Sequence, residues 1–243
     1  MPHPRIPLAS VPFDQVDLGL MPYAEAFERQ REALERVVAA RDGTQASAGV
    51  VLTVEHPAVI TVSRRASAGS HVLATPEMLT RAGVEVCETD RGGDVTYHGP
   101  GQLVVYPILD LSLLNVGIHD YMRMLEQAII DTCSAFGVAA ERDPAATGVW
   151  VRNSSGELAK VAAMGVRVRK WVSMHGLAIN VTTDMSHFGL IVPCGLTRPV
   201  TSLSQLLGER CPSWAVVRAT LLEKLATLVA EKWAAADAKR SAP

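Results

Sequence analysis

The chain has 243 residues, of which 48% are hydrophobic and 20% are charged, and its formal net charge is -2. This composition is typical of a globular protein that buries a substantial core, and the small net charge gives no electrostatic reason to expect nucleic-acid binding. The N-terminus has no apolar segment of signal-peptide length, and no later segment approaches the length of a membrane span, so we expect a cytoplasmic protein without membrane contact.

The first part of the chain is predicted to form a helix, two strands and a second, short helix. Residues 23–41 have helical spacing and strong helix formers. Residues 48–65 favour two strands interrupted at His56-Pro57, because proline cannot donate a hydrogen bond to a strand ladder. Thr75 followed by Pro76 is typical of the start of a short helix, with the threonine as its cap.

The middle of the chain contains a glycine-rich loop between two strand-like runs, at residues 84–93 and 103–111. A helix over residues 118–136 follows, and Gly137 ends it. One apolar stripe indicates this helix, and its members are Ile118, Tyr121, Met122, Leu125, Ile129, Cys133 and Phe136.

The rest of the chain alternates between strand-like and helical segments. Strands are predicted at residues 148–152, 158–171 and 172–181, and helices near residues 202–207 and 213–236. Strands interleaved with a few long helices predict an α+β fold, with a mixed β-sheet packed against helices in two layers. We expect a single domain over residues 1–243, in which about residues 237–243 form a frayed tail.

Four cysteines, Cys87, Cys133, Cys194 and Cys211, are possible chemical groups. No two form a Cys-x-x-Cys pair, so structural zinc and thioredoxin-like chemistry are poorly supported. Cys133 lies on the apolar helical stripe and is predicted to be a packing residue. Cys194 lies between Pro193 and Gly195 after an apolar run, where both a nucleophile and a small buried hydrophobic residue are possible.

A nucleophilic Cys194 would need a partner that takes its proton, and His98, His175 and Lys160 are available. Strand alternation predicts that Lys160 shares a face with the apolar residues Ala162, Met164, Val166 and Val168. Desolvation on that face would lower the pKa of Lys160 toward neutrality. The alternative is a lysine at a strand edge that extends into water.

The loop from Arg91 to Gln102 is the densest polar and glycine-rich stretch of the chain. It has no Gly-Lys-Ser/Thr sequence and leads into a strand, which argues against a phosphate-binding loop and a dinucleotide-binding turn. The loop either covers an apolar ligand or has a purely structural role. No His-x-x-x-His pair or clustered carboxylate supports a metal site, so we expect no metal.

Several motifs together resemble the octanoyltransferase (lipoyl(octanoyl) transferase) family. The strongest are RGGDVTYHGPGQLVVYP (91–107), KVAAMGVRVRKWVSMHGLAINV (160–181) and FGLIVPCG (188–195). EHPAVITVSRRA (55–66) and TGVWV (147–151) also look like segments of that family. The likeness covers roughly residues 50–207 in order and register.

The resemblance implies the fold shared with the catalytic modules of biotin and lipoate protein ligases. It also implies an activity, the transfer of an octanoyl group from acyl carrier protein to a lysine of lipoate-dependent enzymes. The acceptors of the family are lipoyl domains of dehydrogenase-complex E2 subunits and the glycine-cleavage H protein. No cofactor and no ATP are expected for this acyl transfer.

The resemblance also assigns residues. The family's nucleophile matches Cys194, and the lysine that lowers its pKa matches Lys160. The acyl-binding segments match Arg91, Gly92, Gly93, Asp94, Val95, Thr96, Tyr97, His98, Ala163, Met164, Gly165, Gly176, Leu177 and Ala178. Docking of the acidic carrier protein would use basic residues, for which Arg64, Arg65, Arg152, Arg167, Arg169 and Lys170 are available.

Three rival functions fit parts of the same pattern. An ATP-dependent lipoate or biotin ligase shares the fold and a site lysine, but it does not need a nucleophilic cysteine. An amidotransferase would use the same cysteine and lysine with a lipoyl domain as the donor. A non-enzymatic acyl-binding module would leave Cys194 inert.

Overall fold

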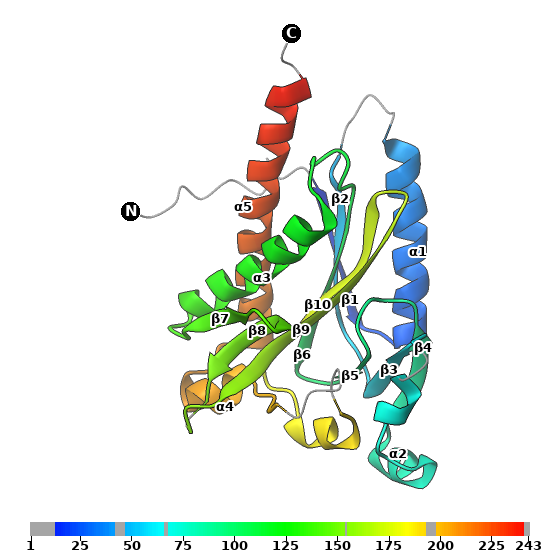
Figure 1. Cartoon of the computed structure of the whole chain (residues 1–243), viewed down its shortest axis with the longest axis vertical. Coiled ribbons are helices and arrows are strands. Elements are labelled where there is room, and N and C mark those ends of the chain that lie inside the picture. The colour runs from blue at the N-terminus through cyan, green and yellow to red at the C-terminus, as the bar shows by residue number, and fades with distance from the viewer. Residues whose placement is uncertain (1–12, 42–46, 66–67, 154, 193–197, 241–243) are drawn as a thin grey trace.

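The computed structural model describes residues 13–41, 47–65, 68–153, 155–192 and 198–240. Its main feature is a seven-stranded mixed sheet in the order β1-β2-β6-β10-β9-β8-β7. The strands in that order are Phe13–Leu20, Gly49–Glu55, Gln102–Leu109, Val172–Asn180, Leu158–Arg169, Ala146–Arg152 and Ala140–Asp143. Only β1 and β2 run parallel among the paired strands of this sheet, and the long β9–β10 hairpin crosses its middle (Figure 1).

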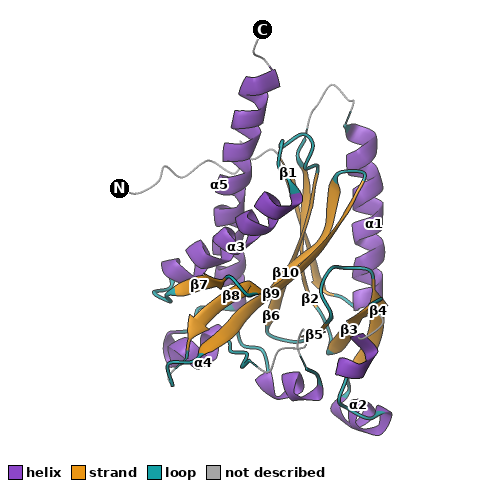
Figure 2. Cartoon of the chain, in the orientation of Figure 1, coloured by secondary structure: helices purple, strands orange, loops and turns teal. Residues whose placement is uncertain are grey.

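A smaller three-stranded sheet lies beside the end of the large one. Its order is β4 (Glu85–Thr89), β3 (Val59–Ser63) and β5 (Val95–His98). Figure 2 shows this sheet near the start of α1, with α2 (Pro76–Ala82) beyond it. The small sheet therefore brings the segment that contains Arg91 and His98 to one end of the large sheet.

Helices cover both faces of the large sheet. On one face, α1 (Tyr23–Ala40) packs on β2, β6 and β10 around a core that includes Val54, Val104 and Ile108. On the other, α3 (Ile118–Ala135) and α5 (Trp214–Arg240) enclose the largest core (Figure 1). The remaining helix is α4 (Leu203–Leu207), and short 3-10 helices span Ala68–His71, Met185–Leu190 and Gly208–Arg210.

The predicted helices and the mixed-sheet fold class are confirmed. Thr75 caps α2, because its side chain accepts a hydrogen bond of 3.3 Å from the Met78 N–H. Two residues of the predicted α3 stripe lie outside the core, since Ile118 is 50% exposed and Met122 is half-buried. The C-terminal helix continues past Ala236 to Arg240, where the Arg240 guanidinium donates to the Leu113 carbonyl at 2.6 Å.

Three strands were not predicted from the sequence, and the pairing of two others differs from a simple hairpin. β1 is an exposed edge strand with polar residues, β5 lies inside the glycine-rich stretch, and β7 has only four residues. The two strands on either side of His56-Pro57 belong to different sheets, β2 to the large one and β3 to the small one.

No helix within the described ranges is long and apolar enough to cross a membrane.

Candidate active site

A cavity lies on the α1 face of the large sheet, where the small sheet meets β9 and β10. It brings together nine of the predicted binding residues: Arg91, Thr96, His98, Ala163, Met164, Gly165, Gly176, Leu177 and Ala178. Four further lining residues, Tyr23, Val104, Tyr106 and His175, were not predicted to bind substrate. Tyr23 and Val104 come from elements outside the quoted binding segments, so only the tertiary structure places them here.

The other five predicted binding residues lie outside the described lining of the cavity. These residues are Gly92, Gly93, Asp94, Val95 and Tyr97. Val95 and Tyr97 pack in the core of the small sheet with Ile60 and Phe188. The Asp94 Oδ2 atom lies 2.5 Å from Nδ1 of His71.

Glycines let the loop backbone approach the sheet closely. The Gly92 N–H donates to the Val166 carbonyl at 3.0 Å, which fixes the loop on β9. A Cβ atom at Gly165 would lie 2.5 Å from the Gly92 carbonyl oxygen. Gly165 therefore accommodates another part of the backbone. The same holds at Gly176, where a Cβ would lie 2.3 Å from the Val105 carbonyl oxygen.

Arg91 fixes the start of the loop. Its guanidinium donates to the Thr61 carbonyl at 3.3 Å, to the Thr61 hydroxyl at 3.1 Å and to the Gly92 carbonyl at 3.0 Å. These bonds join the loop to β3. Because Arg91 also lines the cavity, it contributes a positive charge to the cavity wall.

His98 is held neutral by burial. Burial, reinforced by nearby His56, lowers the pKa of His98 to about 3. The neutral ring donates from Nδ1 to the Gln102 Oε1 atom at 2.6 Å. The Gln102 amide donates to Asn180 Oδ1 at 2.8 Å, and the Asn180 amide donates to the Thr201 carbonyl at 3.0 Å. This buried chain joins the cavity to the segment that follows Cys194.

His175 is held neutral in an unusual backbone conformation. Burial lowers its pKa to about 3, helped by the positive charges of Arg91 and Arg167. Its φ is 58°, a value that costs energy for a residue other than glycine. The Gln30 side chain accepts from its N–H at 2.8 Å, and Asp90 accepts from Nε2 at 2.8 Å. Such low pKa values make His98 and His175 weak acceptors for a thiol proton, which favours Lys160 among the predicted partners.

The predicted orientation of Lys160 is wrong, because a β-bulge interrupts the alternation of β9. Val149 of β8 pairs with Ala162, but the next residue, Trp150, pairs with Lys160, so Val161 is an extra residue. Val161 and Ala162 both point into the α3–α5 core. Lys160 therefore points away from the face of Ala162. It lies on the other face of the sheet, together with Ala163 and the cavity.

Lys160 is buried, with 7% of its surface exposed, although it is not among the residues that line the cavity. Its Nζ lies 4.7 Å from the centroid of the Trp150 ring. Gly148 makes space for the side chain, since a Cβ there would lie 3.0 Å from Lys160 Cε. The Lys160 N–H donates to Pro199 at 2.9 Å, and the Thr201 N–H donates to the Lys160 carbonyl at 3.0 Å.

Cys194 lies outside the described residues, as do Pro193 and Gly195. On one side of this gap, the Val192 N–H donates to the His71 carbonyl at 2.8 Å. On the other side, residues 199–201 are bonded to the backbone of Lys160, as described above. Residues 199–201, which follow the gap, therefore lie directly beside Lys160.

The three described cysteines are poor nucleophiles. Cys133 is fully buried, as predicted, and burial raises its pKa to about 12. Burial and the neighbouring Glu85 raise the pKa of Cys87 to about 11. Burial also raises the pKa of Cys211. Among the residues that the structure describes, no group of three or more His, Cys, Asp or Glu side chains could hold a metal ion.

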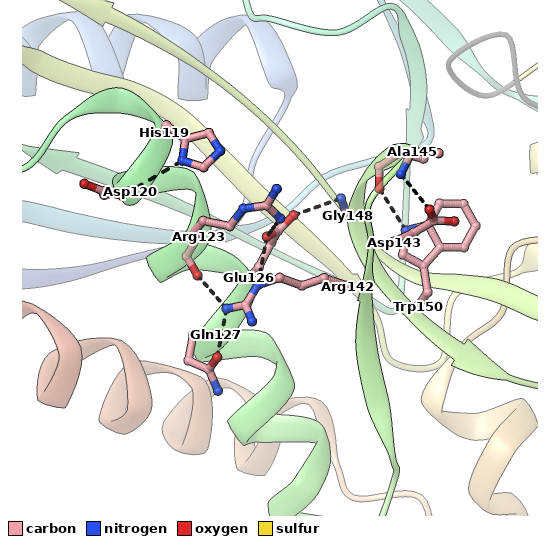
Figure 3. A network of polar contacts seen from close by, with 11 residues as sticks. His119, Asp120, Arg123, Glu126, Gln127, Arg142, Asp143, Ala145, Gly148 and Trp150 are labelled. Atoms are coloured by element: carbon pink, nitrogen blue, oxygen red, sulfur yellow. Dashed lines mark hydrogen bonds and ion pairs between the residues drawn. The ribbon is translucent and has the colours of Figure 1, made fainter.

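A buried acidic residue supports the strand that carries Trp150. Glu126 of α3 has a side chain that is 2% exposed and accepts hydrogen bonds from Arg123 at 2.6 Å and Arg142 at 3.1 Å. Its other oxygen accepts from the Gly148 N–H at 3.5 Å. Figure 3 shows this carboxylate between the two arginines and directed toward β8. The sequence signal for this network is the position of Glu126, an acidic residue that directly follows Leu125 of the apolar stripe in the predicted helix.

Comparisons with known proteins identify the family and the fold of the chain. The family model for the lipoyl protein ligase A/B catalytic domain matches residues 22–226. The chain is 46% identical over 201 residues to an octanoyltransferase of Gloeobacter violaceus, covering 83% of this chain and 82% of the relative. It is 51% identical over 190 residues to an octanoyltransferase of Solibacter usitatus, covering 78% and 81%.

A solved structure shows the same fold. The bipartite lipoate protein ligase of Thermoplasma acidophilum superposes with a TM-score of 0.65 at 15% identity, over 89% of this chain and 83% of the ligase chain. The resemblance in sequence and the predicted fold class are both confirmed. The chain belongs to the lipoyl protein ligase A/B catalytic domain family and, within it, to the octanoyltransferases, which are acyltransferases.

Proposed function

We propose that this chain transfers an octanoyl group from octanoyl-acyl carrier protein to a specific lysine of lipoyl domains, through a thioester on Cys194. The observation that carries the proposal is the bulge at Val161, which turns the buried Lys160 toward the cavity face. Residues 199–201 are hydrogen-bonded to the same lysine. The closeness of Lys160 to residues that soon follow Cys194 in the chain supports the proposed pairing of the two side chains.

In the first half of the reaction, Lys160 takes the proton of the Cys194 thiol. The thiolate attacks the carbonyl carbon of the donor thioester. The bond to the carrier's sulfur breaks, and that sulfur takes the proton back from Lys160. The octanoyl group is then bound to Cys194 as a thioester.

In the second half, the amine of the target lysine attacks the thioester carbonyl. An amide forms, the bond to the Cys194 sulfur breaks, and the amine's proton returns to the Cys194–Lys160 pair. Because a thioester is converted to an amide, the reaction runs downhill without ATP. The enzyme is then ready for the next donor.

The cavity accommodates the octanoyl chain. Ala163 of β9 pairs with Ala178 of β10, and these two small residues form an apolar part of its floor, whereas the side chains of Met164 and Leu177 pack toward the α3–α5 core. An alkyl chain on this floor extends away from Lys160 along the two strands.

The predicted docking residues are not equivalent. Arg167 pairs with Asp90, Arg152 with Glu141, and Arg169 and Lys170 with Glu35. Arg64 and Arg65 are exposed and make no ion pair with other described residues. We propose that these two arginines after β3 contact the acidic carrier protein, and that the rate of association falls with salt and in Arg64→Ala or Arg65→Ala.

Incubation with octanoyl-acyl carrier protein, followed by intact-mass measurement, tests the function directly. We expect one octanoyl adduct on the wild-type chain, none on Cys194→Ala, and an undiminished adduct on the control Cys211→Ala. Addition of a lipoyl domain should discharge the adduct onto its lysine. No adduct on the wild type, or an equal one on Cys194→Ala, would contradict the proposal.

The rival functions give different results in the same assay. An ATP-dependent ligase would require ATP and would keep its activity in Cys194→Ser. An amidotransferase would prefer an octanoylated lipoyl domain over the carrier protein when the two donors compete. A binding module would hold the acyl chain without turnover.

A further inference from the structure

The Trp150 ring lies close to two basic side chains at the proposed reaction centre, those of Lys160 and Arg198. It pairs across the strands with Lys160, and its side chain is almost fully buried, with 1% exposed. The Lys160 Nζ lies 4.7 Å from the ring centroid, and the Arg198 Cζ lies 5.2 Å from the same centroid. One indole ring thus contacts both the site lysine and the segment that follows Cys194.

The ring is fixed in this position. Its Nε1–H donates to the Ala146 carbonyl at 3.1 Å. Arg198 also forms an ion pair with Asp143, whose side chain is 7% exposed and accepts from the Ala145 N–H at 2.8 Å. Figure 3 shows the Trp150 ring beside Asp143. The ring is therefore held close to both Lys160 and Arg198.

The face of an indole ring attracts a cation, and the attraction grows when water is excluded. Lys160 is 7% exposed, so water competes weakly for its amine. The attraction acts on the ammonium form of Lys160 and not on the neutral amine. Arg198 repels an ammonium, but Asp143 offsets the charge of Arg198 through their ion pair.

We propose that Trp150 is a positioning residue that stabilises the ammonium form of Lys160 and so favours the transfer of the Cys194 proton to it. In this step the S–H bond of Cys194 breaks and an N–H bond forms on Lys160 Nζ. The consequence for catalysis rests on the proposed function above. The contact between the ring and the amine does not.

A test has to separate this electronic role from simple packing, because Trp150→Leu would also leave a cavity in the core. Tryptophans that carry one to four ring fluorines keep nearly the same shape, while the fluorines withdraw electrons from the ring face. We would place them at position 150 alone, among the four tryptophans of the chain. The matched control places them at Trp214, whose ring is contacted by Arg218 at 5.8 Å.

The first readout is the pKa of Lys160 itself, followed by ¹⁵N NMR of the side-chain nitrogens in a Cys194→Ala background. The chain has five lysines, and Lys160→Arg identifies the signal that belongs to position 160. We expect the pKa to fall stepwise with each fluorine, by about one unit in total. The Trp214 series should leave it unchanged. A constant pKa across the Trp150 series would overturn the inference.

The second readout is the rate at which iodoacetamide alkylates Cys194 at pH 7 in the otherwise unmodified chain. We expect this rate to fall by up to about tenfold, in the same order as the Lys160 pKa. A falling pKa with a constant alkylation rate would overturn the link to Cys194 and the proposed role of Lys160. Failure of the octanoyl adduct to form would instead contradict the proposed function alone.

Discussion

Gly165→Ala tests whether the loop at Arg91–Gly93 has to touch β9 for the cavity to form. The added Cβ would lie 2.5 Å from the Gly92 carbonyl oxygen, whereas ordinary contacts begin at 3.4 Å. The Cβ atom is bonded to the backbone of β9, and the Gly92 oxygen belongs to the backbone of the loop. Neither can rotate away as a side chain could, so the loop would have to move by nearly 1 Å. That movement would weaken the bond of 3.0 Å from the Gly92 N–H to the Val166 carbonyl. Overpacking of this kind costs about 1–3 kcal/mol.

Urea unfolding would measure that loss of stability, and the rate of octanoyl-adduct formation would measure the change in the cavity. We expect both to fall in Gly165→Ala. Gly189→Ala is the matched control, because a Cβ at Gly189 would meet nothing within 4 Å. If Gly165→Ala and Gly189→Ala behaved alike in both measurements, the loop would not be held in the way argued above.

Three further predictions concern stability. Burial lowers the pKa values of His56, His98 and His175 to about 4, 3 and 3, so the unfolded chain binds protons near pH 5 that the folded chain does not. Stability should therefore be complete above about pH 6.5 and fall as the pH decreases, by up to roughly 4 kcal/mol per pH unit. His98→Gln should reduce this slope by about one third, and the exposed control His119→Gln should leave it unchanged; an equal slope in all three proteins would contradict the assignment. Glu126→Gln should cost about 1–3 kcal/mol, as measured by urea unfolding, because two arginines lose a buried carboxylate. The exposed pair Arg31–Glu28 provides the control Glu28→Gln, which should cost less than about 0.5 kcal/mol, and similar losses for both would refute the buried network. Trp171 is 55% exposed with a φ of 62°, so Trp171→Gly should stabilise the chain by about 1 kcal/mol, and a lower melting temperature would contradict this.

The helices were predictable because their periodicity, caps and composition all favoured the same structure. Thr75 and Pro76 are an example, since the predicted cap forms its hydrogen bond in the structure. The strands β1, β5 and β7 were harder, because polar edge residues and a glycine-rich context hide the alternation on which such predictions depend. These strands form because their backbones pair with the neighbouring strands β2, β3 and β8, and not because of a pattern in their own residues.

The cavity was predictable where it is built from contiguous motifs, such as Ala163–Gly165 and Gly176–Ala178. Tyr23 and Val104 come from elements that only the folded chain brings to the same place. The direction of Lys160 was mispredicted for a physical reason, since nothing in the residue sequence around Val161 marks the extra residue of a bulge.

The bulge at Val161 has a consequence for how relatives of this chain are compared. In a regular strand, two residues on the same face are separated by an even number of positions. Lys160 and Ala163 share a face at a separation of three. A relative with this odd separation therefore has to carry the extra residue, and a relative without the bulge needs an even separation to direct an amine at the same cavity. Counting residues between the lysine and the small residue thus reveals the local strand geometry of a relative before its structure is known.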